Sequence, residues 1–162
     1  MGKINLLRVD DRLIHGQVMT KWSKGMGTNA LYVIDDETAA DDFMKDIYIA
    51  TNSSANLKIK VFSVQEVIDE FKETQFGDDV AILLFKNIIS AKKVIDAGLK
   101  ADTLNIGGIA KKSNSTFVIS TVGLSREDAD LLKEVEAKGV QVYFQIVPDT
   151  AKVSLDEAIK KL

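Results

Sequence analysis

The sequence contains no cysteine and only one histidine among its 162 residues. Without cysteine the chain has no disulfide framework, no thiol nucleophile and no zinc site of the usual Cys/His type. A metal site built only from carboxylates stays open, but no stretch has the spacing of a calcium-binding loop. The shortage of these residue types therefore excludes several common chemistries and draws attention to the single imidazole.

The sequence also lacks an excess of charge and a long apolar run. It has 21 basic and 24 acidic residues, a net charge of -3, which argues against a nucleic-acid partner. No apolar run approaches the roughly 20 residues that span a bilayer, so no direct membrane insertion is expected. The start MGKINLL has no extended apolar region with a cleavage site, and Leu6 replaces the Ser or Thr of a lipidation signal. We expect a cytoplasmic protein.

Apolar, β-rich runs recur along the chain, and most are followed by a helical pattern. These runs cover residues 3–9, 29–35, 57–63, 79–85, 103–106, 116–120 and 140–147. Helical patterns follow at 16–24, after the run at 29–35 as far as about residue 50, and at 64–75, 88–98, 125–138 and the C-terminus. Such alternation predicts α/β class: an open, mostly parallel sheet of about six to seven strands with helices on both faces. We expect one domain that spans residues 1–162, with a glycine turn at 107–108.

Several helix boundaries are marked by capping residues. Segments 63–66 and 154–157 fit the capping-box pattern, and segment 125–128 is a near relative of it. Gly98 and Gly139 stand where helices are expected to end. Asp36 is expected to cap the helix after the second strand.

The single histidine, His15, lies in the stretch RVDDRLIHGQV, residues 8–18, directly after the first predicted strand. In parallel α/β sheets, sites gather in the loops beyond the carboxyl ends of the strands. Residues 35–36, 85–87 and 105–108 occupy corresponding positions after other strands. A lone loop histidine is also a common surface residue, and the charges around it could be a solvated cluster.

The neighbours of His15 suit phosphoryl chemistry. Neutral imidazole is a nucleophile, and its pKa near 6.5 leaves it mostly neutral in a cytoplasm. Arg12 can offer a bidentate fork to phosphate, and Asp10 can fix the tautomer and orientation of the imidazole. Gly16 adds no side chain that would block an incoming group. If a helix begins here, the backbone N–H groups that can bind phosphate are those of Ile14, Gly16 and Gln17.

Three other enzyme or receiver classes fit less well. A histidine phosphatase has Arg-His-Gly and a second histidine, whereas here Ile14 precedes His15 and no second histidine exists. A Ser-His-Asp hydrolase needs a G-x-S-x-G elbow, which is absent. Asp35 and Asp36 resemble the acidic pocket of a phospho-aspartate receiver, but the lysine pattern of receivers is not evident. General base catalysis through His15 stays open.

The stretch RVDDRLIHGQV resembles the phosphorylation-site signature of the IIB component of the phosphoenolpyruvate-dependent sugar phosphotransferase system, mannose/fructose/sorbose family. The resemblance extends to VIDDETAADDFMKDIYIA and LLFKNIISAKKVIDAG, and covers essentially all 162 residues. LNIGGIAKK is similar to the Asn-x-Gly-Gly-Met segment of the family, with Ile109 in place of the usual methionine.

The resemblance implies a protein-histidine sugar phosphotransferase with an active-site loop after the first strand. His15 would accept a phosphoryl group from a phosphorylated IIA protein or domain and pass it to a sugar carried by the membrane components IIC and IID. The chain would be a free-standing, cytoplasmic IIB, peripherally associated with the transporter complex, with no cofactor or metal. The secondary site candidates are Arg8, Asp11, Phe85, Gly107 and Gly108.

Several alternatives stay open at this point. A non-catalytic regulatory or interaction module on the same fold is the second functional hypothesis. The sugar is undetermined among mannose, fructose, sorbose and related amino sugars, and so is the phosphorylated nitrogen. A homo-oligomer stays open. The IIA docking surface is expected around the His15 loop, with electrostatic contributions from Arg8, Arg12, Lys21 and Lys24.

Overall fold

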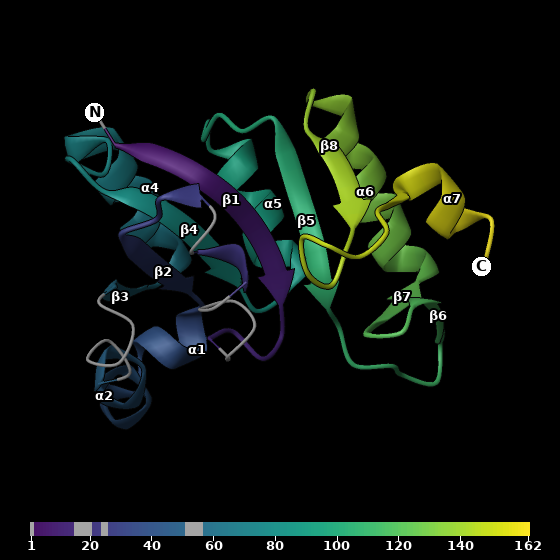
Figure 1. Cartoon of the computed structure of the whole chain (residues 1–162), viewed down its shortest axis with the longest axis horizontal. Coiled ribbons are helices and arrows are strands. Elements are labelled where there is room, and N and C mark those ends of the chain that lie inside the picture. The colour runs from purple at the N-terminus through teal and green to yellow at the C-terminus, as the bar shows by residue number, and fades with distance from the viewer. Residues whose placement is uncertain (1, 15–20, 24–25, 51–56) are drawn as a thin grey trace.

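The computed structural model describes residues 2–14, 21–23, 26–50 and 57–162. A seven-stranded sheet, ordered β3-β2-β4-β1-β5-β8-β9, forms its centre, and a two-stranded sheet of β6 and β7 stands apart from it (Figure 1). The strands are β1 Lys3–Asp10, β2 Ala30–Ile34, β3 Lys58–Phe62, β4 Val80–Phe85, β5 Thr103–Gly108, β6 Ser115–Ile119, β7 Val122–Ser125, β8 Gln141–Phe144 and β9 Val153–Ser154. The helices are α1 Asp36–Ala39, α2 Asp42–Ala50, α4 Val64–Thr74, α5 Ile88–Asp96, α6 Arg126–Ala137 and α7 Leu155–Ile159.

All pairings in the central sheet are parallel except that of β8 with the short β9. The expectation of a mostly parallel sheet with six to seven strands is therefore confirmed. Every residue of β2 is buried, as are five of the six residues of β4. Strands covered on both faces read as continuous apolar runs, which explains sequences such as VAILLF.

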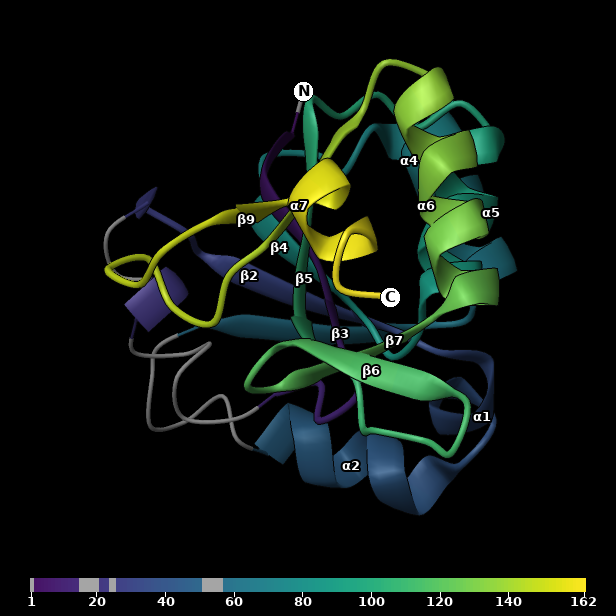
Figure 2. The ribbon, with the colours of Figure 1, turned by 90° about the vertical axis from the view of Figure 1, so that its right-hand side faces the viewer.

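Two hydrophobic clusters fill the two sides of the sheet. Figure 2 shows α4, α5 and α6 side by side along one face, and the larger cluster contains their inward residues. On the other face, Leu13 and Trp22 pack with sheet residues such as Leu31 and Leu84. Ala39 of α1 and Tyr48 of α2 lie against this second cluster. None of the helices in the described residues is long and apolar enough to cross a membrane.

The capping predictions largely hold. Both capping boxes are formed, with Ser63 at the start of α4 and Ser154 at the start of α7. Ser125 caps α6 by accepting a hydrogen bond from the Asp128 backbone N–H at 3.0 Å. Gly98 and Gly139, which follow α5 and α6, have positive φ angles of 108° and 90°, a region that favours glycine.

The cap of α1 requires a correction. Asp35, and not Asp36, is the N-cap, because its Oδ2 accepts from the Thr38 backbone N–H at 3.1 Å. Asp36 instead accepts from the backbone N–H of Val64 at 2.8 Å, and so links α1 to the start of α4. The two carboxylates after β2 therefore have structural hydrogen bonds, which weakens the reading of an acidic receiver pocket further.

Two other expectations differ from the structure, and a third is largely untested by it. The predicted strand at 116–120 does not join the main sheet but pairs antiparallel with β7, which the sequence did not predict. The last apolar run, 140–147, forms a strand only over Gln141–Phe144. The helix predicted at 16–24 lies largely outside the described residues.

Candidate active site

Strands β1, β5 and β8 lie side by side, and their carboxyl ends bring three polar segments together. Asp10 ends β1, Gly108 ends β5, and Gln145 directly follows β8. The loop that leads from β1 toward His15 leaves the sheet at this edge. This is the position at which parallel α/β proteins bind ligands.

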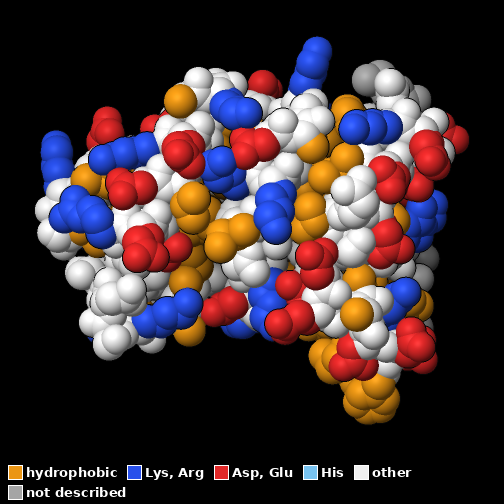
Figure 3. Space-filling view, turned by 180° about the vertical axis from the view of Figure 1, so that it is seen from behind, with side chains coloured by type: hydrophobic (Ala, Val, Ile, Leu, Met, Phe, Trp, Pro, Cys, Tyr) orange, Lys and Arg blue, Asp and Glu red, His pale blue; other side chains and the backbone are white. Residues whose placement is uncertain are grey.

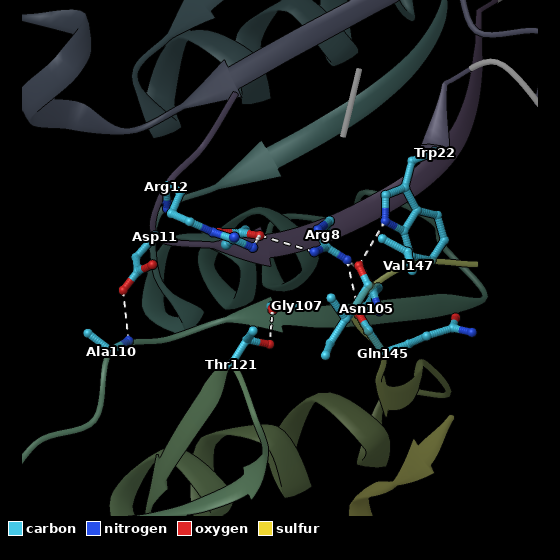
Figure 4. Close-up of polar contacts among 12 residues, drawn as sticks. Arg8, Asp11, Arg12, Trp22, Asn105, Gly107, Ala110, Thr121, Gln145 and Val147 are labelled. Atoms are coloured by element: carbon cyan, nitrogen blue, oxygen red, sulfur yellow. Dashed lines mark hydrogen bonds and ion pairs between the residues drawn. The ribbon is translucent and has the colours of Figure 1, made fainter. Parts of the chain in front are cut away.

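Arg8 is the central side chain of this edge, and it is completely buried. Its Nη1 donates to Asn105 Oδ1 at 2.5 Å and to the Gln145 carbonyl at 3.1 Å, and its Nη2 donates to Asp10 Oδ2 at 3.1 Å (Figure 4). Its Nε has no hydrogen-bond partner within the part of the chain that the structure describes. Burial lowers the pKa of Arg8, and the Asp10 carboxylate offsets part of this shift.

Two further residues fix the plane of the Arg8 guanidinium. The Trp22 ring lies with its centroid 5.2 Å from Arg8 Cζ, a cation–π geometry, and its Nε1 donates to the Ile146 carbonyl at 3.1 Å. On β5, a Cβ at Gly107 would lie 2.0 Å from Arg8 Cζ. The guanidinium therefore packs directly on the Gly107 backbone, which only glycine permits.

Asp10 joins the buried arginine to an exposed one. Its carboxylate is buried and accepts two bonds from Arg12, from Nε at 2.9 Å and from Nη2 at 2.8 Å, besides the bond from Arg8. The Arg12 backbone N–H also donates to Asp10 Oδ1, at 3.1 Å. The hydrogen bonds that Arg12 donates to the Asp10 carboxylate raise the pKa of Arg12. Two arginines share one carboxylate, so the cluster keeps one net positive charge.

The exposed end of this cluster is Arg12, whose side chain is 43% accessible, against 0% for Asp10. A bidentate bond to a carboxylate fixes the plane of a guanidinium as well as its position. The positive charge of the cluster is therefore presented to solvent in a fixed orientation, three residues before His15 in the chain.

A tight turn carries the chain from Asp10 toward His15. The Leu13 backbone N–H donates to the Asp10 carbonyl at 2.9 Å, and Leu13 has a φ of +58°. This left-handed conformation is unfavourable for leucine by about 1–2 kcal/mol. Burial of the Leu13 side chain in the second hydrophobic cluster offsets that strain.

Asp11 attaches the same turn to β5. Its backbone N–H donates to the Gly108 carbonyl at 3.0 Å, and its Oδ2 accepts from the Ala110 backbone N–H at 2.8 Å. Asp11 is thus a structural tether of the turn. The Thr121 hydroxyl donates to the Gly107 carbonyl at 2.8 Å and holds β5 from the opposite side.

The structure places the predicted site residues in different surroundings. Arg8, Asp10 and Arg12 come together, and Asp11 holds their loop. Phe85, by contrast, is fully buried in the larger hydrophobic cluster, so it supports the edge and does not face it. His15, Gly16, Gln17 and Lys24 lie outside the described residues. Ile14 is half-buried beside the second cluster, and Lys21 is exposed.

Gly107 and Gly108 require a correction, because they form no turn but lie in β5. The reason is steric: Gly107 makes room for Arg8, and a Cβ at Gly108 would lie 2.6 Å from Asp10 Oδ1. Asn105 and Gln145 complete the cage around Arg8. Asn105 belongs to segment 105–108, which the sequence placed at a strand end, whereas Gln145 was not predicted at the site. Their signal in the sequence was a polar residue inside an otherwise apolar strand pattern.

A hollow of about 460 Å³ adjoins the turn on the side of α1 and α5. Acidic residues (Asp11, Asp35, Asp36, Glu37) and two lysines (Lys86, Lys93) line it together. No group of three or more His, Cys, Asp or Glu residues in the described ranges is arranged to hold a metal ion.

A family model described as "PTS system sorbose subfamily IIB component" matches residues 4–162. The chain belongs to this family. Among curated IIB relatives, the fructose-specific EIIB component of Bacillus subtilis (strain 168) is 27% identical over 162 residues, covering 100% of this chain and 99% of the relative. The mannose-specific EIIAB component of Escherichia coli (strain K12) is 29% identical over 159 residues, covering 98% of this chain. The chain spans about half of that relative's length, 49%.

Solved IIB structures share the fold throughout. The manxB structure from Thermoanaerobacter tengcongensis is 42% identical with a TM-score of 0.91, covering 99% of this chain and 97% of the other. The IIBSor domain of the sorbose permease from Klebsiella pneumoniae is 27% identical with a TM-score of 0.90, covering 99% and 98%. Membership of this IIB family supports a phosphocarrier role in sugar uptake.

Proposed function

We propose that this chain carries a phosphoryl group in sugar uptake, with His15 as the residue that is covalently modified. The observation that carries the proposal is the Arg8–Asp10–Arg12 cluster, which presents a fixed, partly exposed guanidinium at the carboxyl edge of the sheet. His15 follows that guanidinium by three residues and is the only imidazole of the chain. A fixed positive charge stabilises the charge that develops on the phosphoryl oxygens during transfer.

In the first transfer, a lone pair of neutral His15 attacks phosphorus, and a new N–P bond forms. The N–P bond to the donor phosphohistidine breaks, and the donor, whose other ring nitrogen carries a hydrogen, leaves with its electron pair as a neutral imidazole. No proton has to move if the other nitrogen of His15 keeps its hydrogen. Asp10 is the candidate for the group that orients the imidazole, and the backbone N–H groups of Ile14, Gly16 and Gln17 are candidates for binding phosphate.

In the second transfer, a sugar hydroxyl attacks phosphorus. An O–P bond forms, the N–P bond of phospho-His15 breaks, and the hydroxyl proton is taken up by the departing imidazole. The proposed donor is a phosphorylated IIA protein or domain, and the acceptor is a sugar carried by IIC and IID. We place the chain in the cytoplasm, at the inner side of that membrane complex.

A first experiment tests His15 directly. The protein is incubated with phosphoenolpyruvate, the general phosphotransferase proteins and a IIA protein, and its intact mass is measured. We expect wild type to gain one acid-labile phosphoryl group and His15→Ala to gain none. If wild type gains none from a IIA that phosphorylates a known IIB, the carrier proposal is wrong. The chain would then be a regulatory or interaction module on this fold.

A second experiment tests Arg12. Arg12→Gln removes the charge, and we expect the rate of phosphoryl acceptance to fall by about 10²-fold, as for loss of one group that stabilises transition-state charge. Arg126→Gln is the matched control, because Arg126 is an exposed arginine on α6 and is not part of the Arg8–Asp10–Arg12 cluster. Rapid-quench measurement of phosphorylated protein gives both rates. Equal rates for the two variants would remove Arg12 from the proposed mechanism.

A further inference from the structure

Helix α2 lies on the molecule without burying any of its residues. Its inward side consists of Met44 and Tyr48, which are half-buried, and Tyr48 packs against the second hydrophobic cluster. On the outward side, Phe43 is 73% exposed and Ile47 is 43% exposed. Residues four apart share one helix face, so these two side chains form a continuous apolar surface, which we call the α2 stripe.

The α2 stripe differs from ordinary exposed apolar residues. Single apolar side chains scattered over a surface are normal, whereas neighbouring ones mark interaction sites. In the described part of the chain the large exposed hydrophobic residues are Met26, Phe43, Ile47, Ile49, Ile89 and Phe117. Half of them lie on α2, a helix of nine residues.

Acidic side chains surround the α2 stripe. Residues 36–50 include five exposed carboxylates and one lysine, Lys45. Two of the five, Asp42 and Asp46, lie four residues apart and run alongside the stripe on the same helix. Figure 3 shows hydrophobic side chains projecting at the end of the molecule where α2 lies, with acidic side chains beside them. An anionic lipid surface would be repelled here, and a protein surface rich in Lys and Arg would be attracted.

The α2 stripe also lies at the end of the molecule that carries the candidate active site. Helix α2 follows β2 and α1, at the same edge of the sheet where β1 ends at Asp10 (Figures 1 and 2). A protein that covers α2 therefore comes up to the edge from which the His15 loop departs.

We propose that the α2 stripe docks the cytoplasmic loops of the membrane component that receives the phosphoryl group; this inference rests on the proposed carrier function. Cytoplasmic loops of membrane proteins carry an excess of Lys and Arg, which complements the acidic surroundings of the stripe. Phe43 is the anchor, since exposed aromatic residues that become buried contribute most to binding energy. The carboxylates steer the approach.

The test separates the two transfers. Acceptance is measured in solution with phosphorylated IIA, and delivery is measured as sugar phosphate formed by membrane vesicles that contain IIC and IID. The variants are Phe43→Ser/Ile47→Ser, which removes the stripe, and Asp42→Lys/Asp46→Lys, which reverses the neighbouring charge. Phe117→Ser is the matched control, because Phe117 is 51% exposed but lies on β6.

We expect acceptance to stay within about twofold of wild type in all variants. For delivery, both double variants should raise the half-saturating protein concentration by about tenfold or more, which is typical for loss of an interface anchor. Phe117→Ser should leave that concentration unchanged. Addition of salt should weaken delivery by wild type and have less effect on the charge-reversed variant.

Four outcomes would overturn the inference. In the first, acceptance by the variants slows as much as delivery, which assigns the stripe to the donor. In the second, the variants change neither acceptance nor delivery. In the third, wild type sediments with protein-free anionic vesicles and the Phe43 variant does not, which assigns the stripe to lipid. In the fourth, sedimentation shows a wild-type dimer that the Phe43 variant dissociates. If wild type accepts no phosphoryl group, the carrier function itself fails. If wild type accepts the group and the variants deliver it as well as wild type does, only the docking inference fails.

Discussion

Position 107, within strand β5, is a glycine because the guanidinium of Arg8 occupies the volume that a side chain would need. The Arg8 Cζ would lie 2.0 Å from a Cβ at this position, and both Nη atoms would lie within 2.4 Å. Arg8 cannot move aside easily, since Asn105, Asp10 and the Gln145 carbonyl all accept its hydrogen bonds. The need for glycine comes from a residue 99 positions earlier in the chain.

Gly107→Ala should therefore destabilise the protein far more than an ordinary glycine substitution. The added methyl group pushes the guanidinium away from Asp10, and we expect a loss of about 3 kcal/mol in the free energy of unfolding. The matched control is Gly77→Ala, at a φ of +57° with no atom near the new Cβ, where backbone strain alone predicts about 1 kcal/mol. Urea denaturation measures both values. Equal losses would mean that Arg8 does not depend on Gly107.

Three strands are joined at the opposite end of the sheet by a polar network around Asp79. Asp79 is buried just before β4, and its Oδ2 accepts from the Tyr32 hydroxyl of β2. Lys58 of β3 donates to Asp79 Oδ1 at 2.7 Å, and the Lys60 ammonium lies 3.6 Å from Oδ2. Burial by itself would raise the pKa of Asp79, but these donors and positive charges outweigh it and lower the pKa.

A lowered pKa makes the contribution of Asp79 dependent on pH. The folded protein holds the carboxylate ionised more strongly than the unfolded chain does, so the contribution is fully present above the unfolded pKa of about 3.9. It is lost as pH falls through the lower, folded pKa. We therefore expect Asp79→Asn to be less stable than wild type by about 2 kcal/mol at pH 7, with a difference that shrinks below about pH 4.

Urea titrations from pH 7 down to pH 3 measure this difference. Asp96→Asn is the control. Lys92 also lowers the pKa of Asp96, but the ion pair between these two residues lies on the surface of α5. An exposed ion pair adds little to stability, so that variant should stay within about 1 kcal/mol of wild type throughout. A constant Asp79→Asn difference over the whole pH range would show that charge plays no part in the network.

At the scale of elements, the sequence predicted what local patterns determine. The capping boxes at Ser63 and Ser154 were predicted, since each is complete within four residues. Strand β7, with the sequence VGLS, was missed because it is short, contains glycine and runs directly into the cap of α6. Strand β9 has two residues and exists only through its pairing with β8. Such elements depend on partners that no local pattern shows.

The same limit applies to the candidate site. Arg8, Asp10 and Arg12 could be predicted together because they occupy alternate positions of one short stretch. Asn105 and Gln145 contact Arg8 across 97 and 137 positions of sequence, so only the sheet order brings them there. Trp22 packs in the second hydrophobic cluster and also contacts the Arg8 guanidinium, which lies 14 positions earlier in the chain.

At the scale of the whole molecule, the strand order joins the two halves of the sequence. Strand β1 lies between β4 and β5, and β5 in turn pairs with β8. The main hydrophobic cluster likewise contains residues from Leu7 to Ala158. No cut through the chain gives two parts that each keep a complete sheet and core. This interleaving supports our proposal that residues 1–162 fold as a single cooperative domain.

Unfolding should then be one transition whichever part of the molecule is observed. Trp22 is the only tryptophan and is 4% exposed against Arg8, so its fluorescence reports on the site face of the sheet. Far-UV circular dichroism reports chiefly on the helices, most of which cover the other face. We expect both signals to give the same urea midpoint and slope. If the fluorescence of Trp22 changes at a lower urea concentration than the circular dichroism does, the site face unfolds separately. The second hydrophobic cluster would then not be coupled to the helical face through the sheet.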